Sequence, residues 1–208
     1  PNLPLVETHD LLYGPTVAPR WAYGMSKAMD EHLALAMQAK VGLKPVITRL
    51  FNTIGPRQVG RYGMVVPRFV ASALAGKDLE IHGDGNQTRA FCDVRDVVRA
   101  MVDLLGNPKH YGQVFNLGND TQISINTLAD RVLTLSGSTA KKKYVSYEQV
   151  YGHTFEDPRD RVPALDKIRG AIGFKPQYTL DQTLTELITL ARGQSVPTTT
   201  PSGSGKQA

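Results

Sequence analysis

The sequence predicts an α/β fold, in which strands buried on both faces alternate with helices. Two largely apolar segments, residues 44–52 and 113–117, lack the regular polar alternation of half-exposed strands, as expected in a parallel sheet. A helical period covers residues 23–41 before the first of them and residues 94–105 before the second. With 208 residues, 41% of them hydrophobic and 21% charged, the chain can bury a sizeable core.

The first predicted elements lead to a ligand-binding edge. Residues 1–20 are rich in proline and glycine and should form an irregular approach. The first helix runs from about Tyr23 to Val41, and Gly42 is a suitable end for it. The strand over 44–52 is followed by a loop over 53–57. Open α/β sheets bind their ligands at this carboxyl end of a strand.

The remaining elements are separated by turn and capping residues. We expect a helix over 65–74, a strand over 79–82, a turn over 83–86 and a strand over 88–91. A helix over 94–105, opened by Asp93 or Asp96, precedes a strand over 113–117. Ser124 caps a helix that runs to about Leu135 and is closed by Gly137, and a loop over 157–163 leads to helices over 164–172 and 180–192. Residues 145–150 remain ambiguous. Residues 194–208 contain mainly Ser, Thr, Pro and Gly and should form a disordered tail.

Composition excludes several classes of protein. The net charge is +5, but the basic residues are scattered and only Lys141 to Lys143 form a run, which argues against a nucleic-acid binder. There is no run of eighteen apolar residues for a membrane span, and no secretory leader follows Pro1. The single cysteine, Cys92, cannot form an internal disulfide, so we expect a packing residue and a cytoplasmic location.

Tyr23 and Lys27 lie four residues apart in the first predicted helix and share one face of it. A phenol is a poor base at neutral pH unless a nearby positive charge lowers its pKa. A partly buried ammonium one helical turn away would supply that charge, so the pair predicts a general base with its electrostatic activator. The spacing alone is also compatible with a surface tyrosine stacked on a lysine side chain.

Five motifs carry a resemblance to a known family. In chain order they are Tyr23-x-x-x-Lys27, Arg49-Leu50-Phe51-Asn52-Thr53-Ile54-Gly55-Pro56-Arg57, Pro67-Arg68-Phe69, Ile81-His82-Gly83-Asp84-Gly85-Asn86-Gln87-Thr88-Arg89-Ala90-Phe91, and Asp157-Pro158-x-x-Arg161-x-Pro163. With them, residues 3–190 resemble the NAD-dependent nucleotide-sugar epimerase/dehydratase family, which belongs to the extended short-chain dehydrogenases/reductases. The resemblance looks closest to the branch that contains UDP-glucose 4-epimerase and UDP-glucuronate decarboxylase.

The resemblance implies a domain organisation. The fold would be the C-terminal portion of a doubly wound, Rossmann-like parallel sheet plus a small mixed α/β substrate-binding domain. Residues 1–60 would belong to the dinucleotide-binding domain and residues 61–193 mainly to the substrate-binding region, with residues 91–117 returning to the sheet. The family's glycine-rich turn and catalytic Ser/Thr would precede Pro1. We therefore expect part of a longer enzyme, inactive alone.

The resemblance also implies a role for individual residues. Tyr23 would be the catalytic base, and Lys27 would activate it and hold the nicotinamide ribose, so both would also contact the cofactor NAD. The other expected contacts are Phe51 on the nicotinamide, Asn52 on the sugar diphosphate, Glu80, Ile81 and His82 along the nucleotide base, and Arg89 and Arg161 on the diphosphate. No metal is expected. Phe51, Asn52, Arg89 and Arg161 each have a purely structural alternative.

Two residues depart from the family pattern. The family usually has an aromatic residue or histidine where this chain has Asp93, and often an acidic residue where it has Arg95. We expect the carboxylate of Asp93 to change the charge near the site.

The implied activity passes through a 4-keto sugar. We favour 4-epimerisation of a UDP-hexose, with UDP-glucuronate decarboxylation second and 4,6-dehydration also open, because all three would share Tyr23 and Lys27. A homodimer that binds a UDP-sugar, but no nucleic acid or membrane, is expected. The rivals are a catalytically silent nucleotide-sugar-binding fragment and, more distantly, a nucleic-acid binder.

Overall fold

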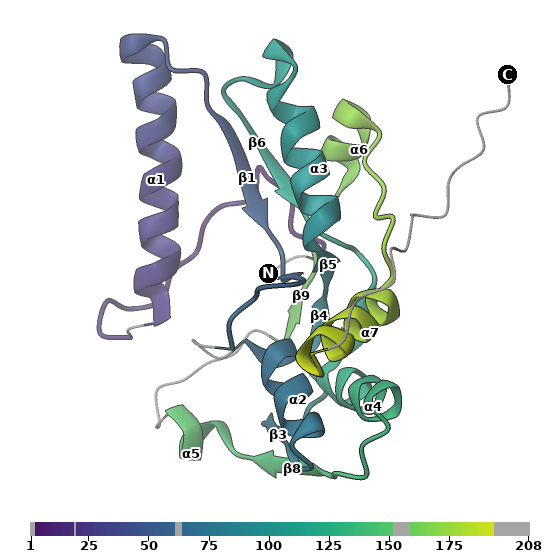
Figure 1. Cartoon of the computed structure of the whole chain (residues 1–208). Helices are drawn as coiled ribbons and strands as arrows, with labels where there is room; N and C mark the ends of the chain where they lie inside the picture. The colour runs from purple at the N-terminus through teal and green to yellow at the C-terminus, as the bar shows by residue number, and fades with distance from the viewer. Residues whose placement is uncertain (1–2, 19, 61–63, 152–158, 194–208) are drawn as a thin grey trace, which may run out of the picture.

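The computed structural model describes residues 3–18, 20–60, 64–151 and 159–193. The α/β class with parallel strands is confirmed (Figure 1). The predicted tail, residues 194–208, lies outside the described residues, as do Asp157 and Pro158 of the fifth motif.

Helices and strands alternate along the chain. The helices are α1 (Arg20–Val41), α2 (Val65–Leu74), α3 (Val94–Leu105), the 3-10 helix η1 (Pro108–His110), α4 (Ile125–Ser136), α5 (Tyr147–Tyr151), α6 (Asp166–Ile172) and α7 (Leu180–Ala191). The strands are β1 (Val46–Leu50), β2 (Thr53–Ile54), β3 (Leu79–His82), β4 (Thr88–Ala90), β5 (Cys92–Asp93), β6 (Gln113–Leu117), β7 (Gln122–Ser124), β8 (Lys142–Val145) and β9 (Asp160–Arg161).

Most strand pairs are parallel. β1 pairs with β6 from Val46 opposite Gln113 to Leu50 opposite Leu117, and the pairs β2–β5 and β3–β8 are also parallel. β4 lies between an antiparallel neighbour, β7, and a parallel one, β9. These pairings join segments that are far apart in the sequence.

The long elements agree with the sequence prediction. α2, β3, α3 and β6 have the predicted bounds, and Asp93 and Ser124 cap α3 and α4 through side-chain hydrogen bonds to backbone N–H groups. The prediction missed the strands β2, β5, β7, β8 and β9. All but β8 have only two or three residues, and each forms by pairing with a distant segment, so no local period predicts it.

Two hydrophobic clusters hold these elements together. The first joins α2, β3, α4 and α7 and includes Phe69, Leu79, Leu128 and Leu184. The second fills the space between β6, α3 and α6 and includes Leu104, Phe115, Leu117 and Ile168. Cys92 belongs to the second cluster, and burial raises the pKa of its thiol to about 12, which confirms it as a packing residue.

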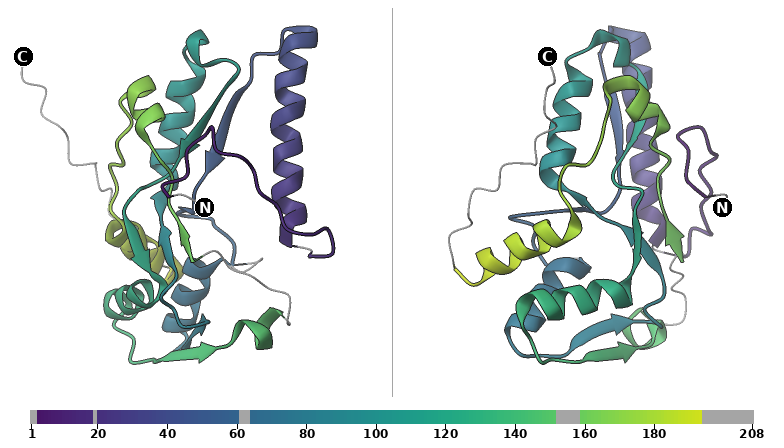
Figure 2. Two further views of the ribbon diagram at one scale, coloured as in Figure 1. Left: turned by 180° about the vertical axis from the view of Figure 1, so that it is seen from behind. Right: turned by 90° about the vertical axis from the view of Figure 1, so that its right-hand side faces the viewer.

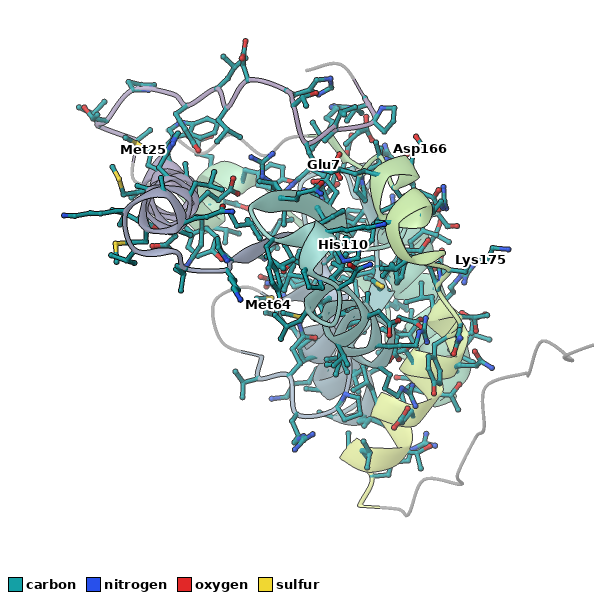
Figure 3. All side chains as sticks on the ribbon, turned by 90° about the horizontal axis from the view of Figure 1, so that it is seen from above. Glu7, Met25, Met64, His110, Asp166 and Lys175 are labelled. Atoms are coloured by element: carbon teal, nitrogen blue, oxygen red, sulfur yellow. The ribbon has the colours of Figure 1, made fainter. Side chains whose placement is uncertain are left out.

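The N-terminal segment is fastened across the ends of the central strands. Leu5 forms a bridge with Pro163, and a carboxylate oxygen of Glu7 accepts a hydrogen bond of 2.8 Å from the backbone N–H of Asn116. Arg49 Nη1 donates to the carbonyl oxygen of Glu7 at 3.1 Å. Figure 3 shows Glu7 at this crossing between α1 and α6. The segment is irregular, as predicted, but these hydrogen bonds fix it against the rest of the chain.

Helix α1 stands on the opposite side of the β1–β6 pair from α3 and α6 (Figures 1 and 2). The side chain of Glu31 in α1 accepts two hydrogen bonds of 2.8 Å from the guanidinium group of Arg49 in β1. The helix also carries exposed apolar side chains spaced four residues apart, namely Met25, Met29, Leu33, Met37 and Val41. Met25 points away from the rest of the chain (Figure 3). We call these five residues the α1 stripe.

Replacing Glu31 by glutamine should loosen α1. The variant removes the charged partner of Arg49, whose side chain is only 23% exposed. We therefore expect the free energy of unfolding to fall by about 1–2 kcal/mol. Urea unfolding would measure this. The matched control is Asp30→Asn on the same helix, because the Asp30–Lys27 pair is exposed and should contribute less than about 1 kcal/mol. Equal losses in both variants would contradict the assigned role of Glu31.

Candidate active site and substrate pocket

The site begins where β1 ends. The backbone N–H of Phe51 donates to the carbonyl oxygen of Leu117 at 3.0 Å. Asn52 adopts the left-handed conformation, with φ of 37°, and its Nδ2 donates to the carbonyl oxygen of Ala90 at 3.2 Å. Asparagine tolerates this conformation better than most residues. Gly118 passes so close that a Cβ there would lie 2.7 Å from Cβ of Phe51. The Phe51–Asn52 corner is therefore fixed in place.

One hollow lies on each side of this corner. The first, which we call the tyrosine hollow, has a volume of about 650 Å³ and lies between α1 and β1. It brings together four residues that the sequence analysis selected: Tyr23, Lys27, Phe51 and Arg161. They come from α1, the end of β1 and β9.

The catalytic pair is more exposed than expected. Tyr23 is 74% exposed, and the side chain of Lys27 is 57% exposed, because few described residues pack on this part of α1. Lys27 Nζ lies 5.9 Å from the Tyr23 ring centre and 2.9 Å from Oδ2 of Asp30. The hydrogen bond to Asp30 raises the pKa of Lys27, so the ammonium group stays charged at neutral pH. The predicted partial burial of the pair is wrong for the described chain.

The second hollow, which we call the arginine pocket, has a volume of about 240 Å³. Three selected residues line it: Asn52, His82 and Arg89. Ile81 does not, because its side chain is fully buried in the first hydrophobic cluster, so only its backbone could serve a ligand. Glu80 lies in the same strand, and its Oε1 is 3.2 Å from Nε2 of His82.

Arg68 is a pocket residue to which the sequence analysis assigned no role. Its Nη1 lies 2.9 Å from Nε2 of His82, and its Nη2 donates to the carbonyl oxygen of Glu80 at 3.0 Å. Burial, helped by the nearby guanidinium charge, lowers the pKa of His82, which favours a neutral ring that can accept from Arg68. The Pro67-Arg68-Phe69 motif was the available signal.

The two predicted diphosphate residues lie side by side. Arg89 of β4 is directly opposite Arg161 of β9 in the parallel pairing. Arg89 lines the arginine pocket, whereas Arg161 lines the tyrosine hollow. Nη1 of Arg89 is held by the carbonyl oxygens of Thr88, at 2.7 Å, and Arg159, at 3.1 Å. Guanidinium groups on adjacent strands are suitably placed to bind one anion together.

The expected effect of Asp93 on the site needs correction. Its buried carboxylate accepts two hydrogen bonds of 2.8 Å from the Arg95 side chain and one of 2.6 Å from Oγ1 of Thr183 on α7. Arg95 also pairs with Glu186 at 2.7 Å and stacks on Tyr178. The charge of Asp93 is thus neutralised at the α3–α7 contact, and the two departures from the family pattern compensate each other.

The tyrosine hollow suits one part of a dinucleotide. Tyr23 and Lys27 offer polar groups, and Phe51, Ile47 and Leu50 offer apolar surface, which together fit a nicotinamide ring and its ribose. Gly83-x-Gly85 lies in the turn between β3 and β4 and opens no helix, so it is no pyrophosphate-binding turn.

In the described part of the chain, no three His, Cys, Asp or Glu side chains are grouped so that they could bind a metal ion. Nor does that part contain a helix with the length and apolar character needed to cross a membrane.

Several known proteins resemble this chain in sequence or in structure. Residues 2–118 match the sequence model of the NAD dependent epimerase/dehydratase family. UDP-N-acetyl-alpha-D-glucosaminuronate decarboxylase of Bacillus cytotoxicus is 39% identical over 186 residues, which cover 89% of this chain and 57% of that protein. The chain spans about half the length of the curated relatives it matches.

Two solved structures illustrate the similarity in three dimensions. UDP-N-acetylglucosamine 4-epimerase from Methanobrevibacter ruminantium, in complex with UDP-N-acetylmuramic acid, has a TM-score of 0.79 and 27% identity and covers 94% of this chain and 59% of its own. UDP-glucuronic acid 4-epimerase from Bacillus cereus, in complex with UDP-glucuronic acid and NAD, has a TM-score of 0.72 and 29% identity, and the match covers 82% of this chain and 52% of the epimerase chain.

Proposed function

Since this chain belongs to the NAD-dependent epimerase/dehydratase family, we propose that a protein containing it modifies a UDP-sugar through a 4-keto intermediate, with NAD as cofactor. The observation that carries the proposal is the adjacent pair Arg89 and Arg161, which joins the two hollows. A diphosphate bound there would extend the sugar toward Tyr23 and the nucleoside into the arginine pocket. Guanidinium groups suit this task because they bind phosphate oxygens bidentately.

The proposed chemistry assigns simple tasks to the residues of the tyrosine hollow. Tyr23 Oη, as phenolate, removes the proton from the 4-hydroxyl group of the sugar. Lys27 supplies positive charge beside it and binds the nicotinamide ribose, and Phe51 supports the nicotinamide ring. NAD, when bound, accepts the hydride from C4 and later returns it. Asn52 and the two arginines orient the sugar for this transfer.

Two reactions follow from the same ketone. The sequence motifs favour 4-epimerisation, in which the hydride returns to the other face of C4. The relative that is 39% identical is named a decarboxylase of a UDP-uronic acid, and we therefore place decarboxylation first. In that reaction the carboxylate lies β to the C4 ketone, so the electrons of the broken bond to carbon dioxide pass into an enolate, which is protonated at C5.

Product analysis tests this proposal. The purified complete protein that contains this chain would be incubated with NAD and either UDP-glucuronic acid or UDP-N-acetylglucosaminuronic acid, and carbon dioxide and the sugar product would be measured. A decarboxylase releases carbon dioxide and a UDP-pentose, or its 2-acetamido analogue, whereas a 4-epimerase gives a product of unchanged mass. A protein that binds UDP-sugars but neither retains NAD nor forms product would instead be the nucleotide-sugar-binding fragment considered above.

The proposed assembly is a cytoplasmic homodimer. The α1 stripe supports self-association, because an exposed apolar ridge that winds along a helix is a suitable dimer contact. Sedimentation of the protein with and without Met29→Lys would test this, with a shift to monomer as the expected result. We also retain, as a proposal, the division into residues 1–60 and 61–193 and the inactivity of this chain alone.

Arg89→Ala should weaken UDP-sugar binding. The variant removes a guanidinium group from the proposed diphosphate site, and the loss of a charge-assisted hydrogen bond of about 1.5–3 kcal/mol predicts a roughly 10- to 100-fold increase in Kd. Calorimetry with UDP would measure it. The matched control is Arg131→Ala, since Arg131 pairs with Asp181 on the surface, and its Kd should stay within about twofold of wild type. An unchanged Kd for Arg89→Ala would remove Arg89 from the site.

A further inference from the structure

Three polar side chains follow one another along one face of α1. Tyr23, Lys27 and Glu31 are spaced four residues apart in this helix, and all three line the tyrosine hollow. The row places a carboxylate one helical turn beyond the ammonium group that is proposed to activate Tyr23. A carboxylate at this spacing attracts a lysine side chain, so an unpaired Glu31 would draw the ammonium group away from the phenol.

Arg49 of β1 holds this carboxylate. Nε and Nη2 of its guanidinium group donate to Oε1 and Oε2 of Glu31, each at 2.8 Å. Nη1 donates to the carbonyl oxygen of Glu7 at 3.1 Å, which fixes the plane of the group from a third side. Both carboxylate oxygens of Glu31 are thus engaged in the bidentate geometry that guanidinium groups favour, and the carboxylate is turned toward β1.

Burial distinguishes this ion pair from a surface contact. The side chains of Arg49 and Glu31 are 23% and 19% exposed, whereas those of Lys27 and Asp30 are 57% and 62% exposed. Removing one partner of a buried pair leaves the other charge uncompensated. A Glu31 carboxylate without Arg49 would therefore take another cation, and the flexible side chain of Lys27 lies one turn away. Asp30 competes for Lys27 only weakly, because exposed ion pairs contribute less than about 1 kcal/mol.

We propose that Arg49 is a positioning residue for the catalytic pair: it sequesters the Glu31 carboxylate and so leaves the Lys27 ammonium group available to Tyr23. Arg49 acts only through Glu31. The inference rests on the proposed role of Tyr23 as the base. Described charged or titratable side chains around the row also include Asp30 on α1, Glu7 and Tyr13 on the N-terminal segment, and Arg161 on β9.

Glutamine replacements in the complete protein that contains this chain test the proposal. In Arg49→Gln the released carboxylate pairs with Lys27, so the acid limb of the pH profile of kcat should move about 1 pH unit toward higher pH. At neutral pH kcat should then fall about tenfold. Glu31→Gln has no carboxylate to release, so its kcat should stay within about threefold of wild type. Adding Glu31→Gln to Arg49→Gln should restore both kcat and the profile.

A titration without cofactor gives a second readout. The ultraviolet absorbance of tyrosinate, after subtraction of the Tyr23→Phe trace, should develop at higher pH in Arg49→Gln than in wild type or the double variant. The matched control is Arg131→Gln, which breaks an exposed pair with Asp181 and should change kcat less than about twofold.

Circular dichroism melting curves would verify that each variant is folded. Arg49→Lys replaces Arg49→Gln if the latter does not fold. A lysine keeps the charge but does not bind both carboxylate oxygens in a fork, so it should shift the pH profile in the same direction by a smaller amount.

The outcomes are distinguishable. A merely structural role predicts similar losses of kcat in Arg49→Gln and Glu31→Gln, an unshifted pH profile and no recovery in the double variant, and this result would overturn the inference. Equal and opposite shifts in the two single variants would also overturn it, because the charges would then act directly on the phenol rather than through Lys27. If Tyr23→Phe retains wild-type turnover, the proposed function itself fails, and this inference fails with it.

Discussion

In the complete enzyme that contains this chain, Tyr23→Phe is expected to lower turnover at least about 100-fold, as removal of a general base does, while the affinity for UDP-sugars changes little. The phenylalanine ring keeps the shape of the side chain but has no hydroxyl group to take the proton from the sugar. Steady-state kinetics with the preferred UDP-sugar would give kcat, and calorimetry with UDP would give the affinity. A loss confined to kcat is the signature of an interaction made in the transition state.

A second tyrosine in the same hollow provides the control. Tyr13 also lines the tyrosine hollow, and its hydroxyl group donates to the carbonyl oxygen of Gly24 at 3.2 Å. Tyr13→Phe therefore removes a phenol that is already engaged, and kcat should fall less than about threefold. If Tyr23→Phe kept wild-type turnover, or if both variants lost activity equally, the assignment of Tyr23 as the base would be abandoned.

The sequence predicts those parts of the fold that depend on local pattern. The bounds of α2 and α3 follow from their apolar period and from Gly76 and Asp93 at their ends. The strand β6 follows from its apolar run. The pairing of β4 with β9 could not be predicted in this way, because Arg89 and Arg161 are far apart in the sequence and meet only through the tertiary fold.

The candidate site shows the same division. The motifs identified Tyr23 and Lys27, and the structure places both in one hollow. Arg68 received no role, although it lies in a quoted motif, because its contacts with His82 and Glu80 are visible only once these partners are placed. The concern over Asp93 arose for the same reason. Arg95 neutralises its charge, and a further hydrogen bond comes from Thr183 of α7, ninety residues later.

Asp93→Ala is expected to destabilise the protein by about 3–5 kcal/mol, the usual cost of breaking a buried ion pair from one side. The substitution removes the cap of α3 and leaves the guanidinium group of Arg95 without its bidentate partner. Urea unfolding would measure the free energy of unfolding. The control is Asp181→Ala, whose pair with Arg131 is exposed and should contribute less than about 1 kcal/mol. Similar small losses in both variants would show that Glu186 alone can satisfy Arg95.

The stabilisation by Asp93 should also depend on pH. Burial alone would raise the pKa of Asp93, but the hydrogen bonds from Arg95 and Thr183 outweigh it and lower the pKa below its ordinary value. A carboxylate with a lowered folded-state pKa binds its proton more readily in the unfolded chain. Its stabilisation of the folded state is therefore fully present above the unfolded pKa of about 3.9 and is lost as pH falls through the folded pKa. The difference in unfolding free energy between wild type and Asp93→Asn should therefore be constant from about pH 5 to 7 and shrink below about pH 4. A difference that stayed constant into that acidic range would mean that folding does not shift the pKa of Asp93, and the stabilising ion pair with Arg95 would have to be withdrawn.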